Sequence, residues 1–172
     1  MYYFAYGSNM DEKELTDYMA LSGRDPSGIS NPRWARLNGW RLVFNYFSPS
    51  RGAGAANVEK SDGHWVEGVL WDVTGDAMAY IDKKEGSPSY YERVPGGVEV
   101  SDRQGELHRA VTYQVVHKRR LDNHCPPTVR YLDKMKAAGR RFTFSQEYQQ
   151  LLNGVETTEP RDAAQQHGQR GG

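Results

Sequence analysis

The sequence has a single cysteine, Cys125, so an intramolecular disulfide is excluded, and this usage is typical of a reducing compartment. Lysine plus arginine and aspartate plus glutamate number 22 each, so the formal net charge is zero. A balanced charge lacks the basic footprint of a nucleic-acid-binding protein. No apolar run approaches the ~18 residues of a membrane span, and no basic segment precedes an apolar stretch at the N-terminus. We therefore expect a cytoplasmic protein with no nucleic-acid or membrane partner.

Several catalytic signatures are also missing. None of the five histidines stands at metal-ligand spacing with another histidine or with Cys125. A nucleophilic Cys125 would need a histidine base, and the adjacent His124 would rarely point the same way. The sequence contains no Gly-x-Ser-x-Gly elbow, no phosphate-binding Gly-Lys-Ser/Thr loop and no Gly-x-Gly-x-x-Gly fingerprint. The side chains that remain as candidates for catalysis are carboxylates.

The most informative stretch that is present runs from residue 2 to residue 10, Tyr-Tyr-Phe-Ala-Tyr-Gly-Ser-Asn-Met. It predicts a short aromatic strand that stops at Gly7, followed by a helix that Ser8 or Asn9 caps. Free backbone N–H groups at such a junction attract anions, and Gly7 lets the backbone come close to a ligand because it has no Cβ. An ordinary strand-to-helix turn would give the same pattern, so this segment alone leaves both interpretations open.

The rest of the chain predicts one α+β domain over residues 1–155. Strands are expected at residues 40–47, 55–58, 65–73, 90–100 and 109–117, of which the last two form a hairpin. Residues 24–33 are expected to be a loop. Helices are expected from residue 11, after residues 74 and 145, and from 129 to 139. The elements do not alternate as β-α-β-α, which favours a small, mainly antiparallel, barrel-like sheet. Residues 156–172 are polar, and we expect them to be a disordered tail.

Two carboxylates are candidates for acid–base chemistry. Glu85 follows two lysines and precedes Gly86 at a predicted helix end, and Glu67 lies inside the predicted strand 65–73. Most glutamates are solvated surface charges. The residues alone do not choose between Glu67 and Glu85.

Several pieces of the chain, in this order, resemble the γ-glutamylcyclotransferase family. A lone Tyr-Gly-Ser-Asn would be a weak match, whereas the same order of all the pieces, ending in Pro-Pro and Tyr131, is specific. The pieces span about residues 2–152 and are Tyr3–Asn9, Ala55–Val58, Val66–Trp71, Glu85–Gly86, Tyr90–Tyr91, Ala110–Tyr113 and Cys125–Tyr131.

The resemblance implies a small α+β barrel, no metal or organic cofactor, and cleavage of a γ-glutamyl amide. The substrate would be a γ-glutamyl amine or γ-glutamyl amino acid, and the products 5-oxoproline and a free amine. Glu85 would be the acid/base, and the alternative is a non-catalytic γ-glutamyl or small-molecule binding module of the same fold. The expected substrate-binding residues are Tyr3, Phe4, Ala5, Tyr6, Gly7, Ser8, Asn9, Tyr91, Tyr113 and Tyr131.

This chemistry suits a site without a protein nucleophile, because the substrate's own α-amine attacks its γ-carbonyl and the protein must chiefly orient it. A glutamate with a pKa of roughly 4.3 is a weak base for an ammonium with a pKa of about 7.7–8, and burial reduces that gap. We therefore expect Glu85 in an aromatic pocket lined by Tyr91 and Tyr113, with Lys83 and Lys84 pointing to solvent. An amino acid, a lysine side chain and a natural-product amine all remain open as the leaving group, and the sequence does not indicate an oligomeric state.

Overall fold

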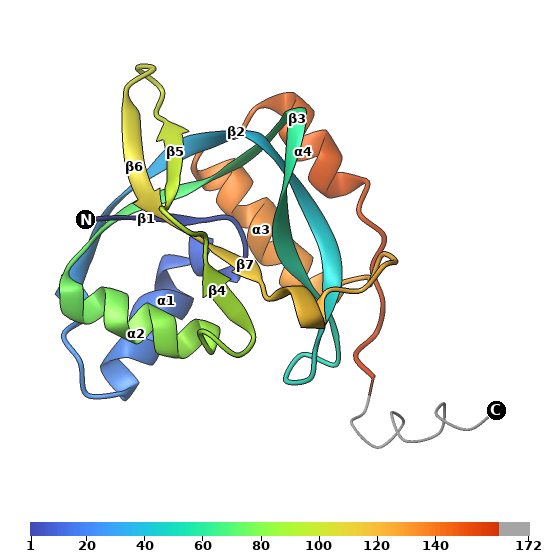
Figure 1. The fold of residues 1–172 in the computed structure, drawn as a ribbon, viewed down its shortest axis with the longest axis horizontal. Coiled ribbons are helices and arrows are strands. Elements are labelled where there is room, and N and C mark those ends of the chain that lie inside the picture. The colour runs from blue at the N-terminus through green and yellow to red at the C-terminus, as the bar shows by residue number, and fades with distance from the viewer. Residues whose placement is uncertain (162–172) are drawn as a thin grey trace.

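The computed structural model describes residues 1–161, and its centre is a closed five-stranded barrel (Figure 1). The barrel pairs β1 with β6 in parallel, and its other neighbouring strands pair antiparallel. A separate antiparallel pair joins β4 (Tyr91–Arg93) to β7 (Tyr113–Val115). The α+β class and the mainly antiparallel barrel are therefore confirmed. In the order of pairing, the barrel strands are β1 (Tyr2–Ala5), β3 (Ala53–Val73), β2 (Ile29–Ser48), β5 (Val98–Ser101) and β6 (Leu107–Val111).

The α-helices pack around this barrel, with α1 and α2 near one another on one side and α3 and α4 on another (Figure 1). Thr74, Thr128 and Ser145 cap α2, α3 and α4 through their side-chain oxygens. Short 3-10 turns occupy Ser8–Met10, Pro26–Gly28 and His117–Arg119. The helices are α1 (Glu12–Leu21), α2 (Gly75–Glu85), α3 (Val129–Arg141) and α4 (Gln146–Asn153).

The cap of α1 differs from the prediction. Asp11, and not Ser8 or Asn9, accepts from the backbone amides of Lys13 and Glu14, at 3.0 and 3.3 Å. Ser8 and Asn9 instead lie in the 3-10 turn that precedes the helix, where both are buried. Their side chains are therefore free for contacts other than capping.

The two long strands also differ from the prediction. β2 has 20 residues and takes in residues 29–33, which were expected to be loop. β3 has 21 residues and joins the two strands predicted at 55–58 and 65–73. The β2–β3 ladder carries three register shifts, and such bulges bend long strands so that they can follow a barrel. Sequence reading missed this continuity because the bulges break the alternation of side chains.

The predicted hairpin is correct only for β5 and β6. Gly96 and Gly97 have φ angles of +74° and +72°, which form a turn that separates β4 from β5 within the predicted strand 90–100. The predicted strand 109–117 likewise divides into β6 and β7. Helix α3 was predicted to end at Gly139 but continues to Arg141, and Gly139 is a buried residue within it, next to the ring of Phe144.

The segment after α4 lies against the body of the protein as far as Arg161. Thr158 donates its backbone N–H to Pro127 O at 2.9 Å, and Arg161 donates to Gly52 O at 2.8 Å. Residues 156–161, which were expected to belong to a disordered tail, are therefore ordered against the domain. Backbone hydrogen bonds, rather than apolar side chains, hold them there. The expectation for residues 162–172 lies outside the described residues.

Between residues 1 and 161, the structure contains no helix that is both long and apolar enough to traverse a bilayer.

Candidate active site

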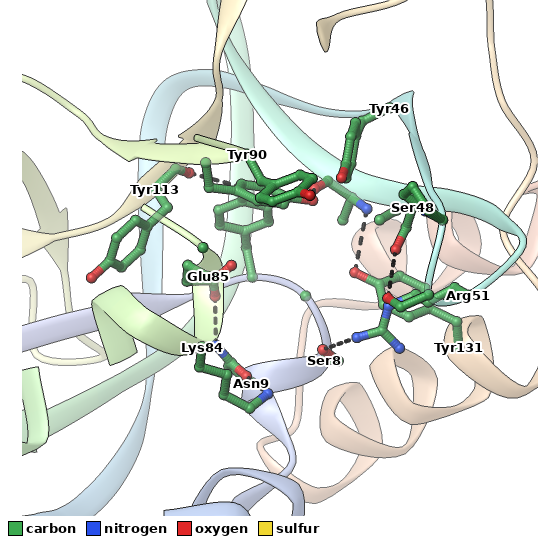
Figure 2. A pocket seen from close by; sticks show the side chains of 18 of the residues that line it. Ser8, Asn9, Tyr46, Ser48, Arg51, Lys84, Glu85, Tyr90, Tyr113 and Tyr131 are labelled. Atoms are coloured by element: carbon green, nitrogen blue, oxygen red, sulfur yellow. Dashed lines mark hydrogen bonds between the residues drawn. The ribbon is translucent and has the colours of Figure 1, made fainter. Parts of the chain in front are cut away.

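A cavity of about 410 Å³ opens between the loop after β1, the end of α2 and the turn between β2 and β3. Figure 2 shows Glu85 and Lys84 on one side of this cavity and Arg51 and Tyr131 on the other. Most of the expected site residues line it together: Tyr3, Tyr6, Gly7, Ser8, Asn9, Glu85, Tyr91, Tyr113 and Tyr131.

Two expected site residues do not line the cavity. The side chains of Phe4 and Ala5 are 0% and 1% exposed and belong to the barrel core. The Phe4 ring packs over Gly68 of β3, where a β-carbon would stand within 2.7 Å of it. The alternation of side chains along β1 turns Phe4 away from Tyr3 and into the core, whereas Ala5 shares the side of Tyr3 and is buried without lining the cavity.

The loop after β1 presents backbone amides to the cavity. Met10 and Asp11 donate their N–H groups back to the carbonyls of Gly7 and Ser8, at 3.1 and 3.0 Å. The amides of Ser8 and Asn9 have no backbone acceptor among residues 1–161. The amide of Asn9 is left available to a ligand anion, whereas the amide of Ser8 faces the Tyr131 hydroxyl.

Glu85 is the last residue of α2, and Gly86 ends the helix in the left-handed conformation with a φ of +62°. The side-chain amide of Asn9 donates to Glu85 Oε1 at 2.6 Å, and the Tyr3 hydroxyl lies 3.4 Å from the same oxygen. Burial raises the pKa of Glu85 above its ordinary value, while the positive charge of Lys84 and the contact with Tyr3 act in the opposite direction. The carboxylate is thus placed and tuned as a general base requires.

The tyrosines around Glu85 are neutral, and the hydroxyls of Tyr6 and Tyr91 each donate a hydrogen bond to a backbone carbonyl. Tyr6 donates its hydroxyl to Tyr113 O at 2.7 Å, and Tyr91 donates to Ala56 O at 2.8 Å. Burial raises the pKa of Tyr3, Tyr6 and Tyr91 well above the usual range, so none of these three is a base near neutral pH.

Tyr113 lines the cavity with its ring rather than with its hydroxyl. The hydroxyl points away from Glu85 and donates to Asp82 Oδ1 at 2.7 Å (Figure 2). Tyr113 therefore forms an aromatic wall next to Glu85, in agreement with the expected environment of that carboxylate.

Tyr131 reaches the loop after β1 from α3. Its hydroxyl accepts from the backbone N–H of Ala56 at 3.3 Å and stands next to Gly7. The guanidinium carbon of Arg51 lies 4.6 Å from the centre of the Tyr131 ring, in a cation–π arrangement.

Sequence reasoning missed two cationic residues of this site. Arg51 was not among the expected site residues, yet its guanidinium donates to Ser8 Oγ at 3.1 Å. Lys84 was expected to point to solvent, and that expectation is wrong, because its ammonium donates to Asn9 Oδ1 at 2.6 Å. Lys83, by contrast, is exposed as expected.

Glu14 on α1 explains why the sequence did not indicate the positions of Arg51 and Lys84. Its carboxylate attracts Lys84, Arg51 and Lys134, which come from three different elements. Such a cluster depends on the packing of α1 against the site, and no local sequence signal predicts it.

The competing carboxylate, Glu67, does not line the cavity. It is 1% exposed and accepts from Trp34 Nε1 at 2.7 Å and from the Ser145 backbone N–H at 2.8 Å, as well as from the Ser145 hydroxyl. Glu67 thus joins β2 and β3 to the start of α4, and Glu85 is the carboxylate of the cavity.

Among residues 1–161, one group of side chains has the spacing of a metal site: Asp102, Glu106 and His108 in the β5–β6 hairpin. Asp102 already accepts from the backbone amides of Gln104 and Glu106, both at 2.9 Å, and from His108 at 2.9 Å. These bonds explain the group as the hydrogen-bonded turn of the hairpin.

Comparison with known proteins gives the family. The model of the γ-glutamyl cyclotransferase, AIG2-like family matches residues 3–142. A γ-glutamylcyclotransferase from Bos taurus is 31% identical over 158 residues, which cover 90% of this chain and 78% of the bovine protein. A solved structure of a γ-glutamyl cyclotransferase aligns with a TM-score of 0.76 at 26% identity, over 92% of this chain and 89% of that one. The crystal structure of an uncharacterized Homo sapiens protein aligns with a TM-score of 0.73 at 27% identity, over 91% and 88% of the two chains.

These matches run through nearly the whole described chain and include both sides of the cavity. They place the protein among the small α+β barrels of the cyclotransferase type. The chain belongs to the γ-glutamyl cyclotransferase, AIG2-like family, as the motifs between Tyr3 and Tyr131 predicted. Family membership favours an enzyme over a non-catalytic binding module of the same fold.

Proposed function

We propose that the chain is a γ-glutamylcyclotransferase, which cleaves a γ-glutamyl amide and releases 5-oxoproline and a free amine. The observation that carries the proposal is the carboxylate of Glu85, which faces a tyrosine-lined cavity and accepts from Asn9 at 2.6 Å. It is the only carboxylate that lines this cavity within residues 1–161.

Glu85 carries the proton in both steps of the proposed reaction. As a base it takes a proton from the substrate's α-ammonium, and the free amine then forms a bond to the carbon of the γ-carbonyl. The bond from this carbon to the leaving nitrogen breaks as Glu85 returns its proton to that nitrogen. The new ring nitrogen gives up a second proton, which Glu85 takes up and passes to the leaving amine. One carboxylate therefore suffices, and the reaction consumes no water.

The raised pKa of Glu85 supports this role. A glutamate with an ordinary pKa would accept a proton from an ammonium only uphill, by roughly three units. Burial among Tyr3, Tyr91 and Tyr113 raises the pKa of Glu85 and so reduces the free-energy cost of the transfer.

The glutamyl half needs an anchor for its α-carboxylate, and we assign that anchor to the loop after β1. The free amide of Asn9 and the guanidinium of Arg51 converge at this loop, where the Ser8 amide faces the Tyr131 hydroxyl. Charge-assisted hydrogen bonds of this kind are strong and directional. Tyr6, Gly7, Tyr91 and Tyr113 are proposed as further contacts, whereas Phe4 and Ala5 would act only by shaping β1.

The experiment that tests the proposal is incubation of the purified chain with γ-glutamyl alanine, followed by detection of 5-oxoproline. A cyclotransferase releases 5-oxoproline and alanine in equal amounts. A binding module of the same fold would bind the dipeptide and release neither product, and that result would reject the enzyme. A panel of γ-glutamyl amino acids, ε-(γ-glutamyl)lysine and simple γ-glutamyl amines then identifies the leaving group.

The proposal includes a cytoplasmic location. It is supported by the single free cysteine, Cys125, which is typical of proteins in a reducing compartment.

A further inference from the structure

Three polar side chains form a continuous chain of hydrogen bonds that ends on Glu85. The ammonium of Lys84 donates to Asn9 Oδ1 at 2.6 Å, and Asn9 Nδ2 donates to Glu85 Oε1 at 2.6 Å. Asn9 Nδ2 also donates to the Tyr3 hydroxyl at 2.9 Å. Asn9 therefore uses its side-chain carbonyl on the lysine and its amide hydrogens on the site (Figure 2).

The two charged neighbours fix the orientation of the Asn9 amide. An ammonium can only donate hydrogen bonds, and a carboxylate in its ionised form can only accept them. With the amide rotated by half a turn, its NH₂ group would face Lys84 and its oxygen would face the Glu85 carboxylate, so both contacts would be repulsive. Lys84 thus favours the orientation in which the Asn9 amide donates to Glu85.

Lys84 itself is held in place from the far side. Its ammonium lies 3.4 Å from Glu14 Oε1 on α1, and its side chain is only 14% exposed. Its neighbour Lys83, one residue earlier on α2, is exposed to solvent. The two consecutive lysines of α2 therefore differ in exposure and in partners, and of the two it is Lys84 that hydrogen-bonds to the site.

We propose that Lys84 is a positioning residue, which acts through Asn9 to hold the Glu85 carboxylate in its reactive place. This inference rests on the proposed function, because it assigns Glu85 the proton transfers. Lys84 lines the cavity, but its ammonium is engaged by Asn9 and Glu14. Its contribution is to keep the Asn9 amide donating to Glu85 while Glu85 loses and regains its proton.

The positive charge of Lys84 also acts on the titration of Glu85, against the effect of burial. Removal of that charge should raise the pKa of Glu85 further, so the acid limb of the pH–rate profile should move to higher pH. The other titratable or charged groups that face Glu85 are Tyr3 on β1, Tyr6 in the loop, Glu14 on α1, Arg51 in the β2–β3 turn, Tyr91 on β4 and Tyr131 on α3.

The test compares Lys84→Met, Lys84→Arg and the matched control Lys83→Met in the full chain. We expect Lys84→Met to lower kcat by about 10- to 100-fold, the usual value of one hydrogen bond to a charged group, with a smaller change in KM. Its acid limb should move to higher pH. Lys84→Arg should recover part of the loss because it keeps a cationic donor, and Lys83→Met should behave as the wild type.

A double variant separates positioning from a merely structural role. If Lys84 acts through Asn9, Lys84→Met should lower the plateau kcat in the wild-type background and add little in the Asn9→Ala background. Melting temperatures and binding of 5-oxoproline show whether each variant is folded. If Lys84→Met does not fold, Lys84→Gln keeps a donor without the charge, and its acid limb should move in the same direction.

Three outcomes would overturn the inference: a wild-type kcat and acid limb in Lys84→Met, a full additional loss in the Asn9→Ala background, or a loss of melting temperature with no change in the acid limb. Each leaves the proposed function standing as long as Glu85→Gln is inactive. An active, folded Glu85→Gln protein would instead reject the proposed acid–base role itself.

Discussion

The hydroxyl oxygen of Tyr131 lies 2.8 Å from the point where a β-carbon would stand at Gly7. The φ angle of Gly7 is −117°, outside the left-handed region that favours glycine, and the close approach of Tyr131 leaves no space for a side chain here. Through this contact, α3 closes directly over the loop that presents the amides of Ser8 and Asn9.

The first prediction follows from that contact. Gly7→Ala should displace the Tyr131 hydroxyl and so raise KM or abolish activity, because the new methyl group meets it inside contact distance. Tyr131→Phe removes the oxygen and with it the acceptor of the Ala56 N–H, so its own Tm should fall modestly, and its catalysis should weaken where the hydroxyl contacts the substrate. The loss of Tm caused by Gly7→Ala should then be smaller in the Tyr131→Phe background.

Thermal melts of the two single variants and the double variant test this coupling. Gly75→Ala is the matched control, because a β-carbon at Gly75 meets nothing within 4 Å. Equal losses of Tm from Gly7→Ala in both backgrounds would contradict the steric account.

The second prediction concerns Arg51, which donates to Ser8 beside the proposed carboxylate anchor. Arg51→Met should raise KM by about 10-fold or more, the usual value of one charge-assisted hydrogen bond. Because the anchor serves the glutamyl half, the increase should be equal for γ-glutamyl alanine and γ-glutamyl ethylamide. Steady-state kinetics with both substrates measure it, and Arg41→Met, at an exposed arginine in β2, is the control.

An increase confined to γ-glutamyl alanine would place Arg51 on the carboxylate of the leaving group instead. Inhibition by 5-oxoproline separates the two assignments independently, because this product carries only the glutamyl carboxylate.

Glu67 gives the third prediction, on stability rather than catalysis. Glu67→Ala leaves the donors of Trp34 and Ser145, which are partly buried at this contact, without their acceptor, so we expect a loss of about 1–3 kcal/mol in the free energy of unfolding. Denaturant titration measures this loss. The kcat of the protein that remains folded should match the wild type, and a selective loss of kcat at unchanged stability would contradict the placement of Glu67 outside the site.

The candidate site could be predicted from the sequence to the extent that local motifs define it. The motifs indicated the residues from Tyr3 to Asn9, Glu85 and Tyr131, and the family they implied is confirmed. The strand–loop junction predicted unpaired backbone amides, and the amide of Asn9 has no backbone acceptor among residues 1–161. The cap assigned to Ser8 or Asn9 belongs to Asp11.

What could not be predicted depends on contacts between distant elements. The direction of Lys84 is set by Glu14, which lies 70 positions earlier in the sequence, on α1. No helical periodicity contains that information. The same is true of Glu67, whose partner Ser145 follows it by 78 positions. In the fold, the bulges in β2 and β3 interrupted the two-residue alternation on which strand prediction depends.

The fourth prediction tests the segment after α4. A chain that ends at Val155 loses the hydrogen bonds from Thr158 to Pro127 and from Arg161 to Gly52. Each lost bond should cost about 1 kcal/mol, or roughly 2–4 °C of Tm. Because Gly52 follows Arg51, KM should rise as well. A chain that ends at Arg161 keeps both bonds and is the control, and equal Tm and KM in the two truncated chains would show that the segment contributes nothing.

The central claim, that Glu85 carries the proton, has a consequence for pH dependence. The ionised form of Glu85 is the base, so kcat/KM should fall as the pH decreases through the pKa of Glu85. Burial raises that pKa above the ordinary value of 4.5, so the midpoint of the acid limb should lie above pH 4.5. A limb at or below that value would contradict the assigned environment of the carboxylate.

The most direct measurement is 5-oxoproline release by Glu85→Gln, which keeps the shape of the side chain but cannot accept a proton. Circular dichroism and binding of 5-oxoproline establish first that the variant is folded with an intact cavity. We predict that it binds the γ-glutamyl compound and that its kcat falls by about 10²- to 10⁴-fold or more, because one residue serves both proton transfers. A folded Glu85→Gln protein with near-normal turnover would contradict the account and remove Glu85 from the mechanism.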